Sequence, residues 1–277
     1  MSLLPLFLLF SQGQTPPSSA QPIADLQRRI QMIESQLKSG ETLTTAKGKY
    51  VLFDFVPDRS VTDDLVKGRV AACDKAVEQD CKILNIDLPT NPIEIYFYPG
   101  TAELGKALKL PGPVTGGMSL GNWAAFPDPH SPRDLYGTAC YQIGHALVHE
   151  NWGLYGCQVF SEGLSTYLQA AAEKQAWLTN PKPIEEEPMK DLAQDAKFPP
   201  DFKQAAAFIA YLLSVDKGNP ARLQAVYSGM NTARIRQLQG VGKETWPQRV
   251  EKVFADVYGK DLDHLEADWR QAALYQS

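Results

Sequence analysis

Apolar residues recur with two different spacings along the chain, and these spacings predict different elements. The segments "KYVLFDFVP" and "PIEIYFYPG" are rich in β-branched and aromatic residues, which predicts strands near Tyr50–Phe55 and Ile93–Tyr98. Helical spacing favours a helix from about Val61 to Leu84 and a short one near Thr101 to Leu108. The Gly-punctuated segment "TGGMSLGNWAAFPD" predicts two short strands within residues 115–128.

The pattern changes after Pro132, where helical spacing continues almost to the C-terminus. It is broken by the loop-like segments "NPKPIEEEP", "FPP" and "KGNP". Strands with helices, followed by a mainly helical half, are typical of the α+β class, here with a small mixed sheet. The predicted organisation is a signal peptide at 1–20, a linker and N-terminal helix at 21–48, and one domain at 49–277.

The N-terminus carries a short apolar block. Leu3 to Phe10 is too short to span a bilayer, which takes about 20 residues. Ser18 and Ala20 supply small residues at a cleavage point, although no Lys or Arg precedes the block. We interpret the segment as a signal peptide of a secreted or periplasmic protein, and the alternative is a disordered apolar tail.

Composition and charge narrow the class of protein. A formal net charge of −5, 44% hydrophobic residues and 21% charged residues are ordinary for a soluble globular chain. Mild acidity without a basic run argues against nucleic-acid binding. Of the four cysteines, Cys73 and Cys81 lie on one predicted helix about 12 Å apart, too far for a disulfide. The pairing of Cys73, Cys81, Cys140 and Cys157 is left open, with buried thiols as the default.

The stretch "CYQIGHALVHENWGLYGCQVFSEGLSTYL" contains the candidate chemistry. Tyr141, His145 and His149 follow one another at i, i+4 spacing on the predicted site helix, so they share one face. Glu162 lies on a second predicted helix, from Val159 to Ala171. A catalytic zinc site needs three protein ligands and an open position, and two ligands from one helix with a carboxylate from the next would satisfy this. Taken singly, each of these residues is typical of an ordinary hydrogen-bonded position.

The wording of these blocks resembles the gluzincin metallopeptidases of the MA clan, also called peptidase MA-like proteins. "YQIGHAL" is similar to their H-E-x-G-H-A-L block, and "FSEGLSTY" to their later W-x-x-E-G-L-A-x-Y block. "GGMSLGN" resembles the edge strand beside their cleft, so we expect Gly116–Asn122 to form an exposed edge strand, and "VFADVYGKDLDHLEADWRQAAL" resembles their terminal helix pair. The resemblance implies a zincin-like α+β fold over roughly 49–274. It also implies substrate contacts at Gly116, Gly117, Met118 and Ser119.

Two positions differ from the residues of that family, and these differences determine the function that we expect. His145 and Glu162 match the second and third zinc ligands, whereas Tyr141 replaces the first histidine and Gln142 the general-base glutamate. A carboxamide has no basicity for that role. We therefore expect a metallopeptidase-like pseudoenzyme with no tightly bound cofactor, which binds a peptide or protein segment in the inherited cleft.

One alternative keeps catalysis. His145 and His149 form a His-x-x-x-His pair, so a metal could move one turn along the helix. With a carboxylate from Glu150 or Glu162, this rebuilt site would hold zinc and support an active metallohydrolase. One helical turn is about 5.4 Å, which is far for Glu162 to reach.

Overall fold

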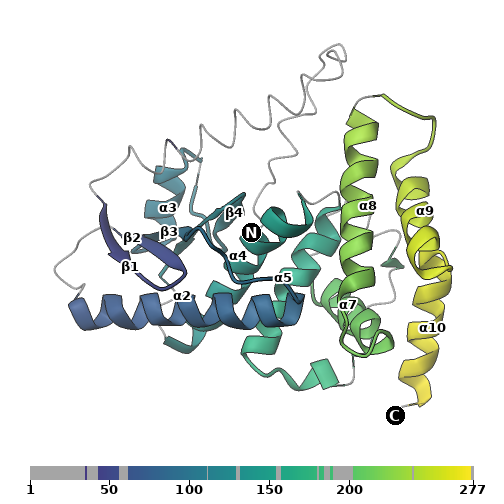
Figure 1. The fold of residues 1–277 in the computed structure, drawn as a ribbon, viewed down its shortest axis with the longest axis horizontal. Coiled ribbons are helices and arrows are strands. Elements are labelled where there is room, and N and C mark those ends of the chain that lie inside the picture. The colour runs from purple at the N-terminus through teal and green to yellow at the C-terminus, as the bar shows by residue number, and fades with distance from the viewer. Residues whose placement is uncertain are drawn as a thin grey trace.

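The computed structural model describes residues 35, 43–55, 62–110, 112–128, 132–153, 157–179, 181–183, 188–189, 202–238 and 240–275. The predicted signal peptide lies outside these residues, as does most of the predicted linker and N-terminal helix. Within them the chain is a mixed α+β structure with one sheet and a large helical part (Figure 1).

The sheet has five strands in the order β1-β2-β3-β5-β4. The strands are β1 (Thr44–Lys47), β2 (Val51–Phe55), β3 (Ile93–Tyr98), β4 (Met118–Leu120) and β5 (Trp123–Pro127). The three central strands, β2, β3 and β5, are parallel, whereas β1 and β4 pair antiparallel at the two edges. The predicted mixed sheet, its two main strands and the pair in the Gly-punctuated segment are thus confirmed. The sequence pattern did not reveal β1, because "TTAK" is short, polar and largely exposed.

The helices of the described residues account for most of the remaining chain. They are α2 (Asp63–Leu84), α3 (Thr101–Ala107), α4 (Pro132–Trp152), α5 (Gln158–Ala172), α7 (Lys203–Val215), α8 (Ala221–Leu238), α9 (Trp246–Tyr258) and α10 (Leu262–Tyr275), with a short 3₁₀ helix, η2 (Ala176–Thr179). Local sequence explains several ends. The Thr62 side chain accepts a hydrogen bond from the Leu65 amide to cap α2, which ends at a left-handed Asn85. Thr245 and Gln248 form a capping box on α9.

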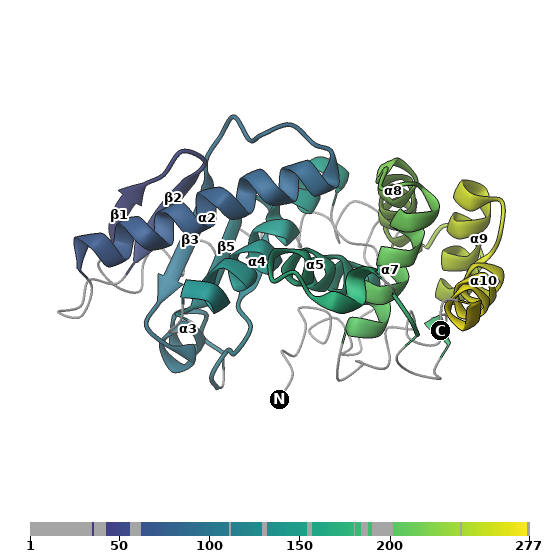
Figure 2. The same ribbon diagram turned by 90° about the horizontal axis from the view of Figure 1, so that it is seen from below.

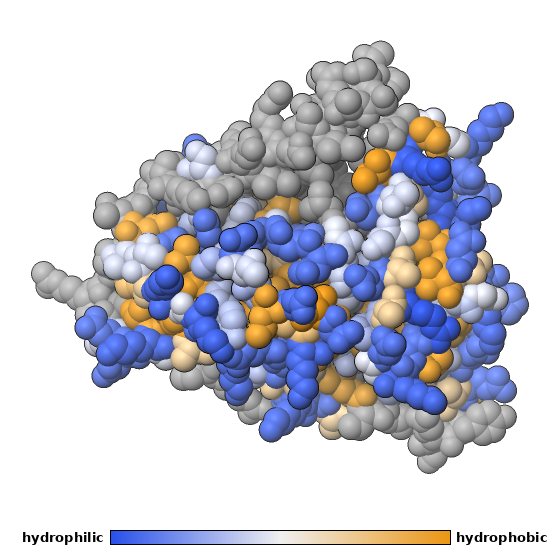
Figure 3. Space-filling view, in the orientation of Figure 1, coloured by the Kyte–Doolittle hydropathy of each residue, from blue (hydrophilic) through white to orange (hydrophobic). Residues whose placement is uncertain are grey.

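The elements are arranged so that α4 and α5 lie between the sheet and the C-terminal helices (Figure 2). Helix α2 packs on α4 and on the first two strands, α5 packs on both α4 and α7, and α8 packs on α9. Hydrophilic residues cover most of the outer surface of α2 on the face shown in Figure 3. In the part of the chain that the structure describes, no helix combines the length and apolar character needed to cross a bilayer.

One large apolar core joins the sheet to the helical part. It includes Phe53 and Ile95 from the sheet, Ile143 from α4, and Phe208 and Trp269 from the C-terminal helices, all 0–1% exposed. A smaller cluster around Tyr96, Tyr98 and Trp123 covers the other face of the sheet. Because α4 is buried along almost its whole length, its polar side chains are held in fixed surroundings. All four cysteines are buried and free, in agreement with the default expectation.

Candidate functional site

The site helix α4 presents the predicted stripe. The rings of Tyr141 and His145 meet edge to face with centroids 5.2 Å apart, and the rings of His145 and His149 are tilted with centroids 6.1 Å apart. His145 and His149 are buried, whereas Tyr141 is half-buried. The i, i+4 spacing read from the sequence therefore corresponds to three adjacent side chains on one face.

Helix α5 brings Glu162 to this stripe. The helix begins at Gln158, one residue before the predicted start, so Glu162 lies in its second turn and not in the first turn as expected. The Tyr141 hydroxyl donates a hydrogen bond to Glu162 Oε2, and His145 Nε2 lies 3.4 Å from the same oxygen. Tyr141, His145 and Glu162 thus converge on one small polar spot between the two helices. We call these three residues the site cluster.

The electrostatics of the site cluster keep Glu162 ionised. Burial raises the pKa of the Glu162 carboxyl, but the charge and hydrogen bond of His145, together with hydrogen bonds from Tyr141 and Gln158, outweigh this and lower it below its ordinary value. The side chain is still 20% exposed. The site therefore holds a stable carboxylate at a partly accessible position.

The site cluster can be compared with the ligand set that the resemblance implies for zinc. His145 Nε2 and Glu162 Oε2 are the two donors that the resemblance pointed to, and Tyr141, at the position of the third, has a phenol that donates to Glu162. Within the described residues, no group of three or more His, Cys, Asp and Glu side chains is arranged to hold a metal ion. Catalytic zinc requires three protein ligands, and His145 and Glu162 supply two of the three that the resemblance implies.

The alternative ligands on α4 are not gathered either. His149 is buried, and burial, with a smaller effect of the nearby His145, lowers its pKa to about 3, so its ring is neutral. Glu150 is exposed at the next position of the helix. A residue at i+1 lies about 100° around the helix, so Glu150 does not share the face of His149.

Gln142, at the general-base position, connects the site helix to the edge strand. Its Nε2 donates to the carbonyl oxygen of Gly116, and Ser119 Oγ donates to its Oε1 at 2.5 Å. Gly117 lies between these two contacts with a positive φ of 97°, and a Cβ there would lie 2.6 Å from the Ala125 carbonyl oxygen. Both ends of the Gln142 amide are therefore used to hold the start of β4.

The predicted edge strand differs in one respect from the expectation. Strand β4 is at the edge of the sheet, as expected, but it covers Met118–Leu120, not the whole segment 116–122. Gly117 is buried, and Gly116, Met118 and Ser119 are half-buried, so the edge is only partly exposed and less open than predicted. The reason is its packing against α4, to which Gln142 ties it.

Two supporting residues were not singled out from the sequence. Ser161 Oγ lies 3.3 Å from His145 Nδ1 and so fixes the second ring nitrogen of the histidine. The Tyr227 hydroxyl, from α8, donates to the carbonyl oxygen of Phe160 in the first turn of α5. Ser161 could have been suspected because it adjoins Glu162, whereas Tyr227 is 65 residues further along and carries no local signal.

Comparison with known proteins adds no family to this geometry. No protein-family model matches the chain, and a search of curated proteins finds no significant match.

Proposed function

We propose that this protein is a non-catalytic, exported member of the zincin-like fold that binds an extended peptide or protein segment along β4. The observation that carries the proposal is the use of both altered residues in internal hydrogen bonds. Tyr141 donates to Glu162, and Gln142 bridges Gly116 and Ser119. These contacts give the altered residues a role in holding the site together in the absence of a metal.

The chemistry of the site argues against hydrolysis by the inherited mechanism. A zinc-bound water is activated because the metal lowers its pKa and a glutamate removes its proton. Gln142 cannot accept that proton, since a carboxamide is not basic, and general-base catalysis typically contributes about 10²–10⁴-fold. Loss of the first histidine removes a ligand as well. Two inherited ligands leave any zinc largely bound by water.

The same contacts favour binding at the sheet edge. β4 ends the strand order, so an extended segment could add to it by backbone hydrogen bonding. Gln142 holds Gly116 and Ser119 in place in advance, which lowers the ordering cost of association. The Glu162 carboxylate is 20% exposed and would offer a charged group beside the site helix.

The proposal is tested by zinc titration and by hydrogen exchange on the full chain. We expect weak zinc binding by the wild type, and tighter binding by the double variant Tyr141→His/Gln142→Glu. Gln142→Glu alone is the matched control, because it restores the base but not the ligand. With a library of extended peptides, amides in Gly116–Asn122 should gain protection. Unchanged exchange there in the presence of a bound peptide would count against the proposed surface.

The rebuilt metal site is the competing proposal, and its motive is the adjacency of the His145 and His149 rings. Its signature would be stoichiometric zinc in the purified protein and metal-dependent peptide cleavage, both lost in His149→Ala. That outcome would replace the non-catalytic function with an active metallohydrolase.

A further inference from the structure

A carboxyl group lies buried directly behind the site helix. Asp80 belongs to α2, and its side chain is 0% exposed where α2 packs on α4. Among the described residues, no nitrogen or oxygen donor reaches either carboxylate oxygen, and the group that interacts with the carboxyl is the weakly polar Cys140 thiol. An isolated carboxylate in such surroundings is very unfavourable, and the group takes up a proton instead.

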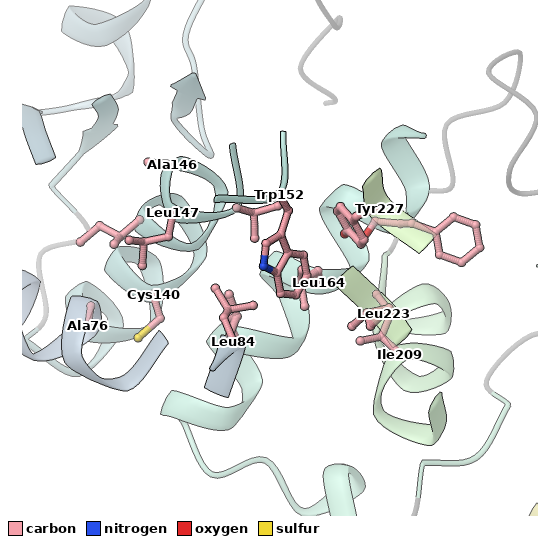
Figure 4. Close-up of a cluster of buried hydrophobic side chains, with 14 of the residues drawn as sticks. Ala76, Leu84, Cys140, Ala146, Leu147, Trp152, Leu164, Ile209, Leu223 and Tyr227 are labelled. Carbon is pink, nitrogen blue, oxygen red and sulfur yellow. The ribbon is translucent and has the colours of Figure 1, made fainter. Parts of the chain in front are cut away.

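The neighbours of Asp80 on its own helix are apolar. Ala76 and Leu84 lie one turn before and one turn after it, on the same face of α2. Figure 4 shows both residues in the buried cluster with Cys140 and Leu147 of α4. Asp80 therefore interrupts an apolar stripe at its centre.

A third helix closes the space around the carboxyl. A Cβ built on Gly144 would lie 3.6 Å from Asp80 Oδ2 and 2.4 Å from Cδ1 of Leu168, which belongs to α5. The carboxyl is thus packed where α2, α4 and α5 meet. Gly144 immediately precedes His145, so the contact lies beside the site cluster in the chain. We call the meeting point of Asp80, Gly144 and Leu168 the junction.

Thiols are the nearest polar groups on α2 and α4. Burial raises the pKa of Asp80 well above its ordinary value, and an interaction with the Cys140 thiol opposes this only in part. Burial, with the neighbouring Asp80, also raises the pKa of Cys140, and it raises the pKa of Cys81 to about 11. Cys73 is buried on α2, and burial raises the pKa of its thiol to about 12. All three thiols are therefore neutral and offer Asp80 no positive charge.

Stronger donors lie at the rim of this region and are used elsewhere. The Tyr136 hydroxyl donates to Gln79 Oε1 at 2.5 Å, and Gln79 Nε2 points to Cys140 Sγ at 4.0 Å. The Lys75 ammonium lies 4.4 Å from the centroid of the Tyr136 ring, on the outer side of α2. α5 contributes the apolar Leu168. The groups that face Asp80 therefore favour its neutral form.

We propose that the packing of the junction depends on a proton. A neutral Asp80 carboxyl lets α2, α4 and α5 pack tightly against one another, and loss of its proton weakens the packing of α4 behind the site cluster. The sign follows from linkage. The folded state binds one more proton than the unfolded state between the ordinary pKa of an aspartate and the higher folded value, so rising pH favours unfolding over that interval. The stabilisation contributed by Asp80 is accordingly largest on the acidic side of this interval.

The experiment compares unfolding of the full chain as a function of pH in the wild type and in Asp80→Leu and Asp80→Asn. Relative to Asp80→Leu, the folding equilibrium constant of the wild type should fall about tenfold per pH unit within the interval. Asp80→Leu replaces the carboxyl with an apolar side chain that matches its neighbours on α2. Asp80→Asn keeps the shape of the side chain but removes the group that titrates. If the free energy of unfolding of the wild type and of whichever variant folds changed with pH in parallel, the proposal would be overturned.

Asp74 provides a matched control on the same helix. Its two carboxylate oxygens accept hydrogen bonds from the backbone amides of Lys49 and Tyr50 at 2.8 and 2.7 Å. Asp74→Asn should lower stability but leave the pH dependence attributed to Asp80 in place. Amide exchange in α4 gives the second readout. It should accelerate with pH more steeply in the wild type than in Asp80→Leu, after correction for intrinsic exchange, and equal pH dependence in the two would contradict coupling to the site helix.

Discussion

Two carboxyl groups pack against α4, and their surroundings shift their pKa values in opposite directions. Glu162 meets the face of α4 that carries Tyr141 and His145, and both of these reach its Oε2. Asp80 meets the neighbouring face at Gly144, and among the described residues no nitrogen or oxygen donor reaches its oxygens, which leaves it the weakly polar Cys140 thiol. The pKa of Glu162 is lowered and that of Asp80 is raised, although burial acts on both in the same direction.

This difference shows that nearby hydrogen-bond donors, and not the extent of burial alone, determine whether a buried carboxyl group is charged. Burial disfavours the anion in each case, but hydrogen bonds and a nearby imidazole reverse the balance at Glu162. The consequence is a helix with a charged acid on the site side and a neutral acid on the core side. Changes to the two acids should therefore have opposite effects on stability.

The largest effect is expected from removing the acceptor of the site cluster. Glu162→Leu deprives Tyr141 and His145 of their shared partner, which should lower the free energy of unfolding by about 1.5–3 kcal/mol at neutral pH. Chemical denaturation is the measurement, with Asp80→Leu as the contrasting variant because it removes an acid that has no such donors. Equal losses in the free energy of unfolding of both variants would mean that the two acids do not differ in how they contribute to stability.

A smaller effect is expected from removing one donor. Tyr141→Phe keeps the ring against His145 but deletes the hydroxyl, and should lower the free energy of unfolding by about 0.5–1.5 kcal/mol. It should also bring the pKa of Glu162 closer to its ordinary value, since this hydrogen bond favours the anion. NMR titration of the Glu162 carboxyl carbon checks the second part. An unmoved pKa would show that His145 and burial alone determine the charge.

The acid-side pH dependence should come in part from Glu162. Because its folded pKa lies below the unfolded value, its stabilisation is present above the ordinary pKa of about 4.5 and is lost as pH falls through the folded value. Glu162→Gln should remove that part of the loss as pH falls below the ordinary pKa of about 4.5, opposite in direction to the change expected for Asp80→Asn. Denaturant midpoints at a series of pH values, at constant ionic strength, test this. A steeper acid-side loss in the variant would reverse the assignment.

The smallest effect is expected from giving the junction a better donor. Cys140→Ser replaces a weakly polar thiol with a hydroxyl, which can donate to Asp80 more effectively. The change in stability at neutral pH should be within about 1 kcal/mol, the size of one hydrogen bond, while the pH dependence attributed to Asp80 becomes shallower. Cys157→Ser, at a buried thiol away from the junction, is the control. The same slope in wild type and Cys140→Ser would show that the hydroxyl does not reach the carboxyl.

Much of the fold was determined by local patterns that the sequence shows directly. The alternation in "VLFDF" and "IEIYFY" predicted β2 and β3, because side chains of a strand alternate between its two faces. The i, i+4 spacing of Tyr141, His145 and His149 predicted their shared face on α4. The convergence with Glu162 followed from the spacing of two blocks that resemble a known site, and not from local pattern alone.

Only the tertiary structure decided which partners these residues have. Gln142 could be read as a lost base, but its bridge between Gly116 and Ser119 depends on how α4 packs against the sheet. Asp80 was visible in the sequence as a polar residue in an apolar stripe, yet its protonation state depends on how α4 and α5 bury it. Hydrophobic periodicity reports which face of an element is buried, whereas the pKa of a buried group depends on atoms contributed by distant segments. That is why the elements could be predicted from the sequence and the chemistry of the two acids could not.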